Sequence, residues 1–135
     1  MGAISIEADV WLINSTLFVG HDQLSLSASR TLSSLYIEPL ISILEAQNPF
    51  IALISDTHNG VHDTAPGQTF YLFVDLKRDG STTWPAVVAA LDPLRTGGWL
   101  TSVQGVTVTA GAVRVVGTGK TPLDLVQSVN QRDYF

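Results

Sequence analysis

The first stretch of the chain alternates between apolar and polar side chains. Over residues 4–13 one set of alternate positions is apolar throughout, and a period of two is the repeat of a β-strand with one buried face. Asn14 and Ser15 are turn-forming residues, and residues 16–19 resume a composition typical of strands. The pattern therefore predicts a β-hairpin, followed by a third short strand over residues 24–28.

After Ser29 the apolar residues change to helical spacing. They recur three or four positions apart, which places them on one side of an α-helix. The stripe consists of Leu32, Leu35, Tyr36, Leu40, Ile43 and Leu44. Pro39 lies inside it, and because proline lacks an N–H and clashes with the preceding turn, we expect a kink or break near Ile37-Glu38. The helix is expected to end before Asn48.

The middle of the chain predicts two more strands and a helix. A continuous apolar run over residues 50–54 is bounded by turn residues, which is typical of a central strand that is buried on both faces. Residues 56–68 form a long polar loop, and residues 69–76 return to a strand pattern. Thr83 can cap a helix over residues 84–94.

A second hairpin is predicted over residues 106–116. A turn at Ala110-Gly111 pairs Val108 with Val113 and places the threonines of the segment on the opposite face. Because one register satisfies both faces, the pattern favours this pairing. A short last helix is expected over residues 121–130.

The order of these elements predicts an α+β fold, with a mostly antiparallel β-sheet and about three helices packed on one face. No linker or repeat divides the chain. Residues 1–130 are therefore expected to form a single α+β domain, and residues 131–135 a C-terminal tail. The expected core contains Leu35, Leu40, Ile43, Leu53, Phe73 and Val108.

Composition and charge narrow the range of functions. The 135 residues include no cysteine, which excludes disulfide frameworks, thiolate zinc sites and cysteine nucleophiles. The net charge is −5 and the seven lysines and arginines are scattered, so neither a nucleic acid nor a membrane surface is an expected partner. Residues 1–13 carry acidic residues where a secretory signal carries basic ones. We therefore expect a protein of the cytoplasm or of a virion, not one secreted by a signal peptide.

Four potential metal ligands lie within eight residues of the long loop: Asp56, His58, His62 and Asp63. Two imidazoles and two carboxylates suit Zn²⁺ or Mn²⁺ if the loop folds back, whereas a solvated polar loop is the alternative. A buried strand that delivers Asp56-x-His58 into a loop also resembles the first metal motif of the calcineurin-like metallophosphoesterases. The resemblance implies an aspartate and a histidine on one of two metals that activate a water. The later motifs of that family are absent from this sequence, and no cofactor is expected.

Charged residues make up only 14% of the chain and hydrophobic residues 45%, which leaves few polar side chains to cover the surface. Extended apolar surfaces usually mark interfaces. The sequence therefore favours a non-catalytic, self-associating structural subunit, such as a virion component of a phage capsid, neck or tail. Its expected partners are copies of itself and other particle subunits. The alternative is a small ligand- or metal-binding domain, or a metal-dependent enzyme, that uses the loop at residues 56–63.

The first hairpin indicates where self-association would occur. A two-residue turn pairs Trp11 with Phe18, flanked by Ile13, on the face opposite the expected core. Large aromatic side chains are favoured anchors of interfaces. Tyr134 and Phe135 of the tail form a second expected contact, because free chain ends rarely become ordered unless they dock. The alternative is that a helix of the same chain covers this face.

Overall fold

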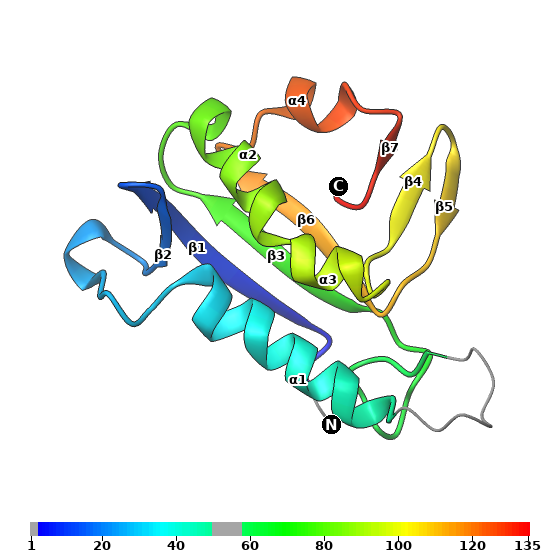
Figure 1. Ribbon diagram of the computed structural model, residues 1–135. Coiled ribbons are helices and arrows are strands. Elements are labelled where there is room, and N and C mark those ends of the chain that lie inside the picture. The colour runs from blue at the N-terminus through cyan, green and yellow to red at the C-terminus, as the bar shows by residue number, and fades with distance from the viewer. Residues whose placement is uncertain (1–2, 50–57) are drawn as a thin grey trace.

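A four-stranded sheet forms the centre of the fold in the computed structural model, which describes residues 3–49 and 58–135. Its strands are β1 (Ser5–Ile13), β2 (Thr16–Val19), β3 (Phe70–Leu76) and β6 (Val113–Gly119). Their order in the sheet is β2-β1-β3-β6 (Figure 1). Strand β1 is parallel to β3, and β3 is parallel to β6, whereas β2 is antiparallel to β1.

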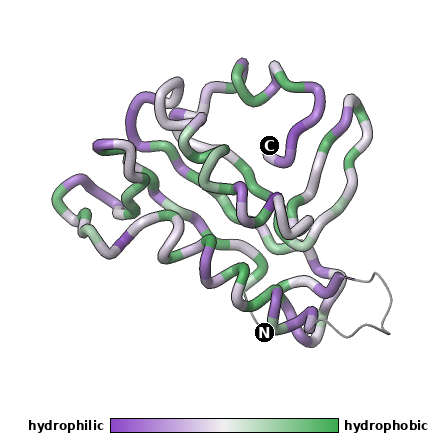
Figure 2. The backbone as a smooth tube through the Cα atoms, viewed as in Figure 1, coloured by the Kyte–Doolittle hydropathy of each residue, from purple (hydrophilic) through white to green (hydrophobic). Residues whose placement is uncertain are grey.

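Three helices pack on one face of this sheet (Figure 1). They are α1 (Glu38–Gln47), α2 (Gly80–Ala90) and α3 (Asp92–Thr96). A short 3-10 helix, η1 (Gln23–Ser25), and a π-helical turn, η2 (Ser33–Ile37), connect β2 to α1. Hydrophobic and hydrophilic residues alternate along α1, as expected when one side of a helix contacts a sheet (Figure 2). No helix in the described part of the chain has the length and apolarity needed to cross a membrane.

A smaller three-stranded sheet lies beside the main one. It is built in the order β5-β4-β7 from β5 (Thr107–Thr109), β4 (Ser102–Gln104) and β7 (Gln131–Arg132), and α4 (Leu123–Gln127) precedes β7. Both of its pairings are antiparallel, so three of the five strand pairings in the two sheets are antiparallel. The predicted α+β class is therefore confirmed.

The core lies between the main sheet and the three helices. Successive side chains of a strand point to opposite faces, so every second residue of the parallel strands enters the core. Those with no exposed surface are Ala8, Val10, Leu72, Val74, Val113 and Val115. The residues between them point to the other side of the sheet, which we call the open face. They include Ser5, Glu7, Asp9, Tyr71, Phe73, Asp75 and Arg114, all half-buried or exposed.

The first hairpin has the predicted register, with Trp11 directly opposite Phe18. Asn14 and Ser15 adopt φ angles of 48° and 63°. A type I′ turn needs positive φ at both central positions, and its twist matches that of the flanking strands. Turn chemistry next to the strands therefore sets this register.

The helix break also lies where Pro39 predicts it. The π-helical turn gives way to α1 at Glu38, whose N–H donates to the carbonyl of Ser33, five residues earlier. Pro39 then lies in the first turn of α1, where a missing N–H costs little. The helix ends at Gln47, before Asn48, as predicted.

Residues 24–28 do not form the expected third strand. Asp22 caps η1 instead, and its carboxylate accepts hydrogen bonds from the N–H groups of Leu24 and Ser25, each at 2.9 Å. Side-chain bonds of this kind compete with strand pairing for the backbone groups. Here they outweigh the apolar alternation that predicted a strand.

The second predicted hairpin is wrong in its partners. Val108 lies opposite Val103, in a hairpin whose turn contains Gly105 at a φ of 61°. Val113 lies opposite Phe70 instead, because β6 pairs in parallel with β3. A valine-rich segment suits either a hairpin or a buried parallel strand, and β3 offers the greater burial.

The predicted core is only partly correct. Leu40 is buried, Phe73 is half-buried on the open face, and Leu53 lies outside the described residues together with the rest of the strand expected at 50–54. Three expected core residues are exposed by 39%, 40% and 50%, namely Leu35, Ile43 and Val108. The π-helical turn explains the first two, because it adds a residue to one turn and rotates the stripe so that Ile37 faces the sheet.

Candidate metal centre

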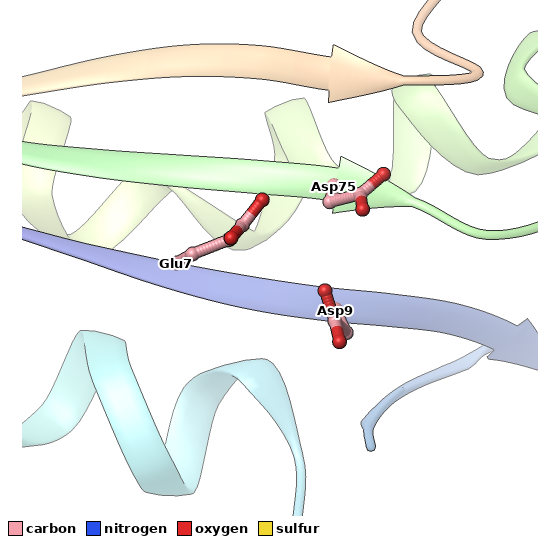
Figure 3. A group of neighbouring side chains, drawn as sticks. All are labelled: Glu7, Asp9 and Asp75. Atoms are coloured by element: carbon pink, nitrogen blue, oxygen red, sulfur yellow. The ribbon is translucent and has the colours of Figure 1, made fainter. Parts of the chain in front are cut away.

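Three carboxylates converge on the open face of the sheet. Glu7 and Asp9 are two residues apart on β1, so both side chains lie on the same face. Asp75 lies directly beside Asp9 in the parallel register of β1 and β3. One carboxylate oxygen from each of the three lies within 4.8 Å of the others (Figure 3). We call these residues the carboxylate cluster.

Asp9 and Asp75 lie toward the carboxyl end of the parallel pairing between β1 and β3, although β1 itself continues to Ile13. The pairing of β1 with β3 ends at Val10 and Leu76, the residues that directly follow Asp9 and Asp75. In open sheets with parallel strands, ligands bind beyond the carboxyl ends of the strands, where the connecting loops diverge. The cluster therefore lies on the open face near the end of this pairing, with Glu7 further inside the sheet than Asp9 and Asp75.

Lys77 neutralises part of this negative charge. Its Nζ lies 3.1 Å from Asp9 Oδ1 and also donates a hydrogen bond to Asp75. The bond to Asp75 raises the pKa of Lys77, and Asp9 adds to the rise, although partial burial opposes it. Lys77 therefore carries its proton at neutral pH, and its ammonium group lies against two of the three carboxylates, Asp9 and Asp75.

His21 approaches the carboxylate cluster from the loop after β2. Its Nδ1 lies 3.4 Å from Asp9 Oδ2, and its side chain is 90% exposed. An accessible imidazole beside a carboxylate is suited to exchange a proton with a bound ligand. The site thus combines three carboxylates, an ammonium group and an imidazole.

The donor set fits a hard divalent cation. Mg²⁺, Mn²⁺ and Ca²⁺ all prefer carboxylate oxygens. The side chains of Asp9 and Asp75 are only 22% and 17% exposed, whereas Glu7 is exposed, so the cluster is partly shielded from water but open on one side. The ammonium group of Lys77 balances one of the three carboxylates. The two remaining negative charges match the two positive charges of a divalent cation.

The residues of this site were not among the candidates from the sequence. Glu7 and Asp9 occupy the polar alternate positions of the first predicted strand, and neither they nor His21, Asp75 and Lys77 had an expected role. The available signal was a pair of acidic residues at alternate positions of a strand, with an Asp-x-Lys at the end of a later strand. Their meeting depends on a parallel pairing between distant segments, which local patterns do not reveal.

The candidate metal ligands from the sequence were Asp56, His58, His62 and Asp63, with a solvated polar loop as the alternative. The first lies outside the described residues, and the last is exposed. The two imidazole rings pack against Trp99 and Phe70, with 4.9 Å and 6.2 Å between ring centroids. Phe70 begins β3, so His62 lies near the amino end of that strand, whereas Asp75 lies near its carboxyl end. Metal binding by these four residues stays a prediction.

The last two residues of the C-terminal tail lie against the rest of the domain, and an interface role for them stays a prediction. Tyr134 is buried, and its ring meets Trp84 edge-on with 5.2 Å between centroids. The N–H of Phe135 donates to the carbonyl of Val115 at 2.9 Å, and its carbonyl accepts a hydrogen bond from the N–H of Gly117 at 2.7 Å. These two contacts place residue 135 alongside β6. Tyr134 and Phe135 therefore pack within the domain.

The other expected interface residues, Trp11, Ile13 and Phe18, are half-buried on the first hairpin. The indole N–H of Trp11 donates to the carbonyl of Gly20 at 2.7 Å, so part of this side chain is engaged within the chain itself. Self-association through the hairpin stays a prediction.

Comparison with known proteins matches the whole chain to a family. Residues 1–135 match the AIM6-like phosphodiesterase domain. Altered inheritance of mitochondria protein 6 homolog from Arthroderma benhamiae is 52% identical over 136 residues, which cover 99% of this chain and 43% of that protein. Altered inheritance of mitochondria protein 6 from Lachancea thermotolerans is 35% identical over 99% of this chain and 33% of its own length. The Saccharomyces cerevisiae protein of that name is 32% identical over 99% of this chain and 36% of its own length. No solved structure matches the chain.

These matches correct the functional prediction. The relatives are fungal proteins, so the prediction of a phage or virion subunit is wrong. The chain spans less than half the length of each of them. The phosphodiesterase description also speaks against the expectation of a non-catalytic protein. The low content of charged residues predicted an apolar surface used for assembly. Part of the apolar content instead belongs to the open face of the sheet, which carries half-buried aromatic residues. The chain belongs to the AIM6-like phosphodiesterase domain family.

Proposed function

We propose that this domain takes part in the hydrolysis of phosphodiesters, with a divalent metal held by Glu7, Asp9 and Asp75. The observation that carries the proposal is the convergence of these carboxylates on one face of two neighbouring parallel strands. The family description supplies the class of reaction. Together they support a metal-dependent phosphodiesterase site on the open face of the sheet.

Charge explains why the carboxylate cluster needs a cation. A phosphodiester is an anion, and unbalanced carboxylates would repel it. A bound divalent cation supplies positive charge and polarises a phosphoryl oxygen. Lys77 links Asp9 to Asp75, which fixes the two carboxylates relative to each other. Its ammonium group also places a positive charge on the face where the phosphate binds.

His21 handles the proton in this proposal. Hydrolysis adds a water oxygen to phosphorus, breaks a P–O bond and delivers a proton to the departing oxygen. The imidazole of His21 is exposed and lies beside Asp9, so it can give that proton to the departing oxygen and regain one from the attacking water. Asp9 orients the ring through Nδ1.

The test is hydrolysis of bis(4-nitrophenyl) phosphate by the full chain. We expect turnover with Mg²⁺ or Mn²⁺, loss of turnover with EDTA, and recovery when the metal is added back. Asp75→Asn should lower the rate by about two orders of magnitude, because a metal contributes several kcal/mol of transition-state stabilisation. Glu45→Gln, at an exposed position of α1, is the matched control and should leave the rate unchanged.

Calorimetric titration with Mn²⁺ alone separates binding from chemistry. Asp75→Asn should weaken Mn²⁺ binding about tenfold or more, since an anionic ligand is lost while the side chain keeps its size. The proposal is wrong if EDTA leaves hydrolysis unchanged. It is equally wrong if Asp75→Asn binds Mn²⁺ and hydrolyses the ester as well as the unaltered protein does.

A further inference from the structure

The residue before His21 is fixed to β1 at both of its peptide groups. The carbonyl of Gly20 accepts a hydrogen bond from the indole N–H of Trp11 at 2.7 Å. The N–H of Gly20 donates to the carbonyl of Asp9 at 3.1 Å. We call Trp11 and Gly20 the backbone clamp. The clamp holds the chain on both sides of the Gly20 Cα atom just before the chain reaches His21.

A side chain at position 20 would press on the turn that follows His21. A Cβ atom there would lie 2.7 Å from Ser25 Oγ and 3.0 Å from Leu26 Cδ2, so the side chains of Ser25 and Leu26 would have to shift. That turn is itself anchored, because Ser25 Oγ donates to the carbonyl of Asp22 at 2.7 Å while the Asp22 carboxylate caps η1. The backbone is therefore fixed before His21 and after it.

The side chain of His21 has little packing of its own. It is 90% exposed, and the contact recorded for it within the described residues is the one with Asp9 at 3.4 Å. A side chain this exposed takes its place from its backbone. We propose that Trp11 is a positioning residue, whose indole N–H holds Gly20 so that His21 lies beside the carboxylate cluster. This inference rests on the proposed function, in which His21 exchanges a proton with the ester.

Trp11 is well placed for such a role. It follows Asp9 by two residues on β1, so its side chain leaves the strand on the same face. Its ring is half-buried opposite Phe18, and a tryptophan N–H in such surroundings needs a hydrogen-bond acceptor. One strand thus carries both the Asp9 carboxylate and the group that places His21. Asp9 contacts the imidazole, and Trp11 holds the backbone that carries it.

The test is Trp11→Phe, which keeps an aromatic ring and removes the donor. With bis(4-nitrophenyl) phosphate and Mn²⁺ we expect kcat to fall by about tenfold to a hundredfold, because a displacement of about 1 Å costs that much. KM and Mn²⁺ affinity should stay within about twofold. In a His21→Asn background, Trp11→Phe should have no further effect on kcat, which a general structural defect would not produce.

Trp84→Phe is the matched control. It removes the same atoms from a tryptophan whose indole N–H has no hydrogen-bond partner among the described residues. Its kcat should equal that of the unaltered protein, apart from any loss of stability. A fall in kcat equal to that of Trp11→Phe would show that loss of tryptophan size, and not of the hydrogen bond, is responsible, and would overturn the inference.

Amide ¹⁵N relaxation of the metal-free protein provides a readout that does not depend on activity. Trp11→Phe should lower the order parameters of Gly20 and His21 from about 0.85 to below about 0.6. If Trp11→Phe does not fold, Gly20→Ala perturbs the clamp instead, because the added Cβ atom would lie 2.7 Å from Ser25 Oγ. Absence of hydrolysis by the unaltered protein overturns the proposed function, and the relaxation data then still decide the clamp. Unchanged order parameters, or additive effects of Trp11→Phe and His21→Asn on kcat, overturn this inference.

Discussion

Asp9 is the residue through which the parts of the site are connected. Its carboxylate faces Lys77 at 3.1 Å and His21 at 3.4 Å, while Asp75 lies directly beside it on the next strand. Its main-chain carbonyl accepts the hydrogen bond from the N–H of Gly20. A single position therefore joins the carboxylate cluster, the ammonium group and the loop that carries His21.

Lys77 and a divalent cation would act on the same carboxylates. Lys77→Met removes the ammonium group but keeps a long apolar side chain, so the metal-free protein should lose about 1 kcal/mol of stability, the upper end for a pair near the surface. That corresponds to a fall in Tm of about 3–5 °C. Mn²⁺ should raise the Tm of the variant more than that of the unaltered protein, because it then relieves a larger repulsion.

Thermal melts followed by circular dichroism, with EDTA and with Mn²⁺, measure this difference. Lys120→Met, at an exposed position after β6, is the control and should show the same Mn²⁺ shift as the unaltered protein. An equal shift in Lys77→Met would mean that lysine and metal do not share the carboxylates.

For single residues, the sequence predicts which face of the strand they occupy but not that three of them form the carboxylate cluster. The alternation over residues 4–13 correctly placed Glu7 and Asp9 on the side opposite the core. Nothing local to either residue points to Asp75, because their proximity arises from the parallel register of β1 and β3. Isolated acidic positions on a strand are most often solvated, so their role becomes visible only when the pairing is known.

The two predicted hairpins show which features of a sequence determine how strands pair. Asn14 and Ser15 adopt the positive φ angles that a two-residue turn requires, so the first hairpin is determined by its own turn. Ala110 and Gly111 provide no such constraint, and Val113 pairs with β3 instead. A periodic apolar pattern fits several partners, and burial by distant strands then decides among them.

The start of α2 offers a test at this scale. Asp79, and not Thr83, caps the helix: its carboxylate accepts hydrogen bonds from the Thr82 hydroxyl at 2.5 Å and from the N–H of Ser81 at 3.1 Å. The bond from Thr82 is the main cause that lowers the pKa of Asp79. Because the pKa is lower in the folded state, the resulting stability is present above the ordinary carboxyl pKa of about 4 and is lost as pH falls through the folded-state value.

Asp79→Ala should therefore lower the Tm at pH 7, and the difference from the unaltered protein should shrink below about pH 4. Melting curves followed by circular dichroism at pH 7 and pH 3 measure both differences. Glu45→Ala, at an exposed position of α1, serves as the control, and its difference in Tm from the unaltered protein should be the same at pH 7 and pH 3. A Tm difference for Asp79→Ala that stays constant over this range would show that the carboxylate charge does not contribute to the cap.

At the scale of the whole molecule, one sheet serves two purposes on its two faces. The open face has an aromatic half near the amino ends of the strands, where the Arg114 guanidinium lies 5.6 Å from the centre of the Tyr71 ring and 4.8 Å from that of Phe135. The carboxylate cluster lies further along β1 and β3, toward the end of their pairing at Val10 and Leu76. Part of the apolar composition that predicted an assembly surface therefore belongs to the face that carries the site.

The core lies between the parallel strands and the helices, and Leu72 is at its centre. Leu72 has no exposed surface and lies on β3, between β1 and β6, so Leu72→Ala should cost about 2–5 kcal/mol of unfolding free energy. Val108 belonged to the core predicted from the sequence, but it is 50% exposed on the small sheet. Val108→Ala should therefore change the unfolding free energy by no more than about 0.5 kcal/mol. Urea unfolding followed by circular dichroism measures both values. A large loss at Val108 with a small loss at Leu72 would favour the hairpin-centred core expected from the sequence over a core between the parallel strands and the helices.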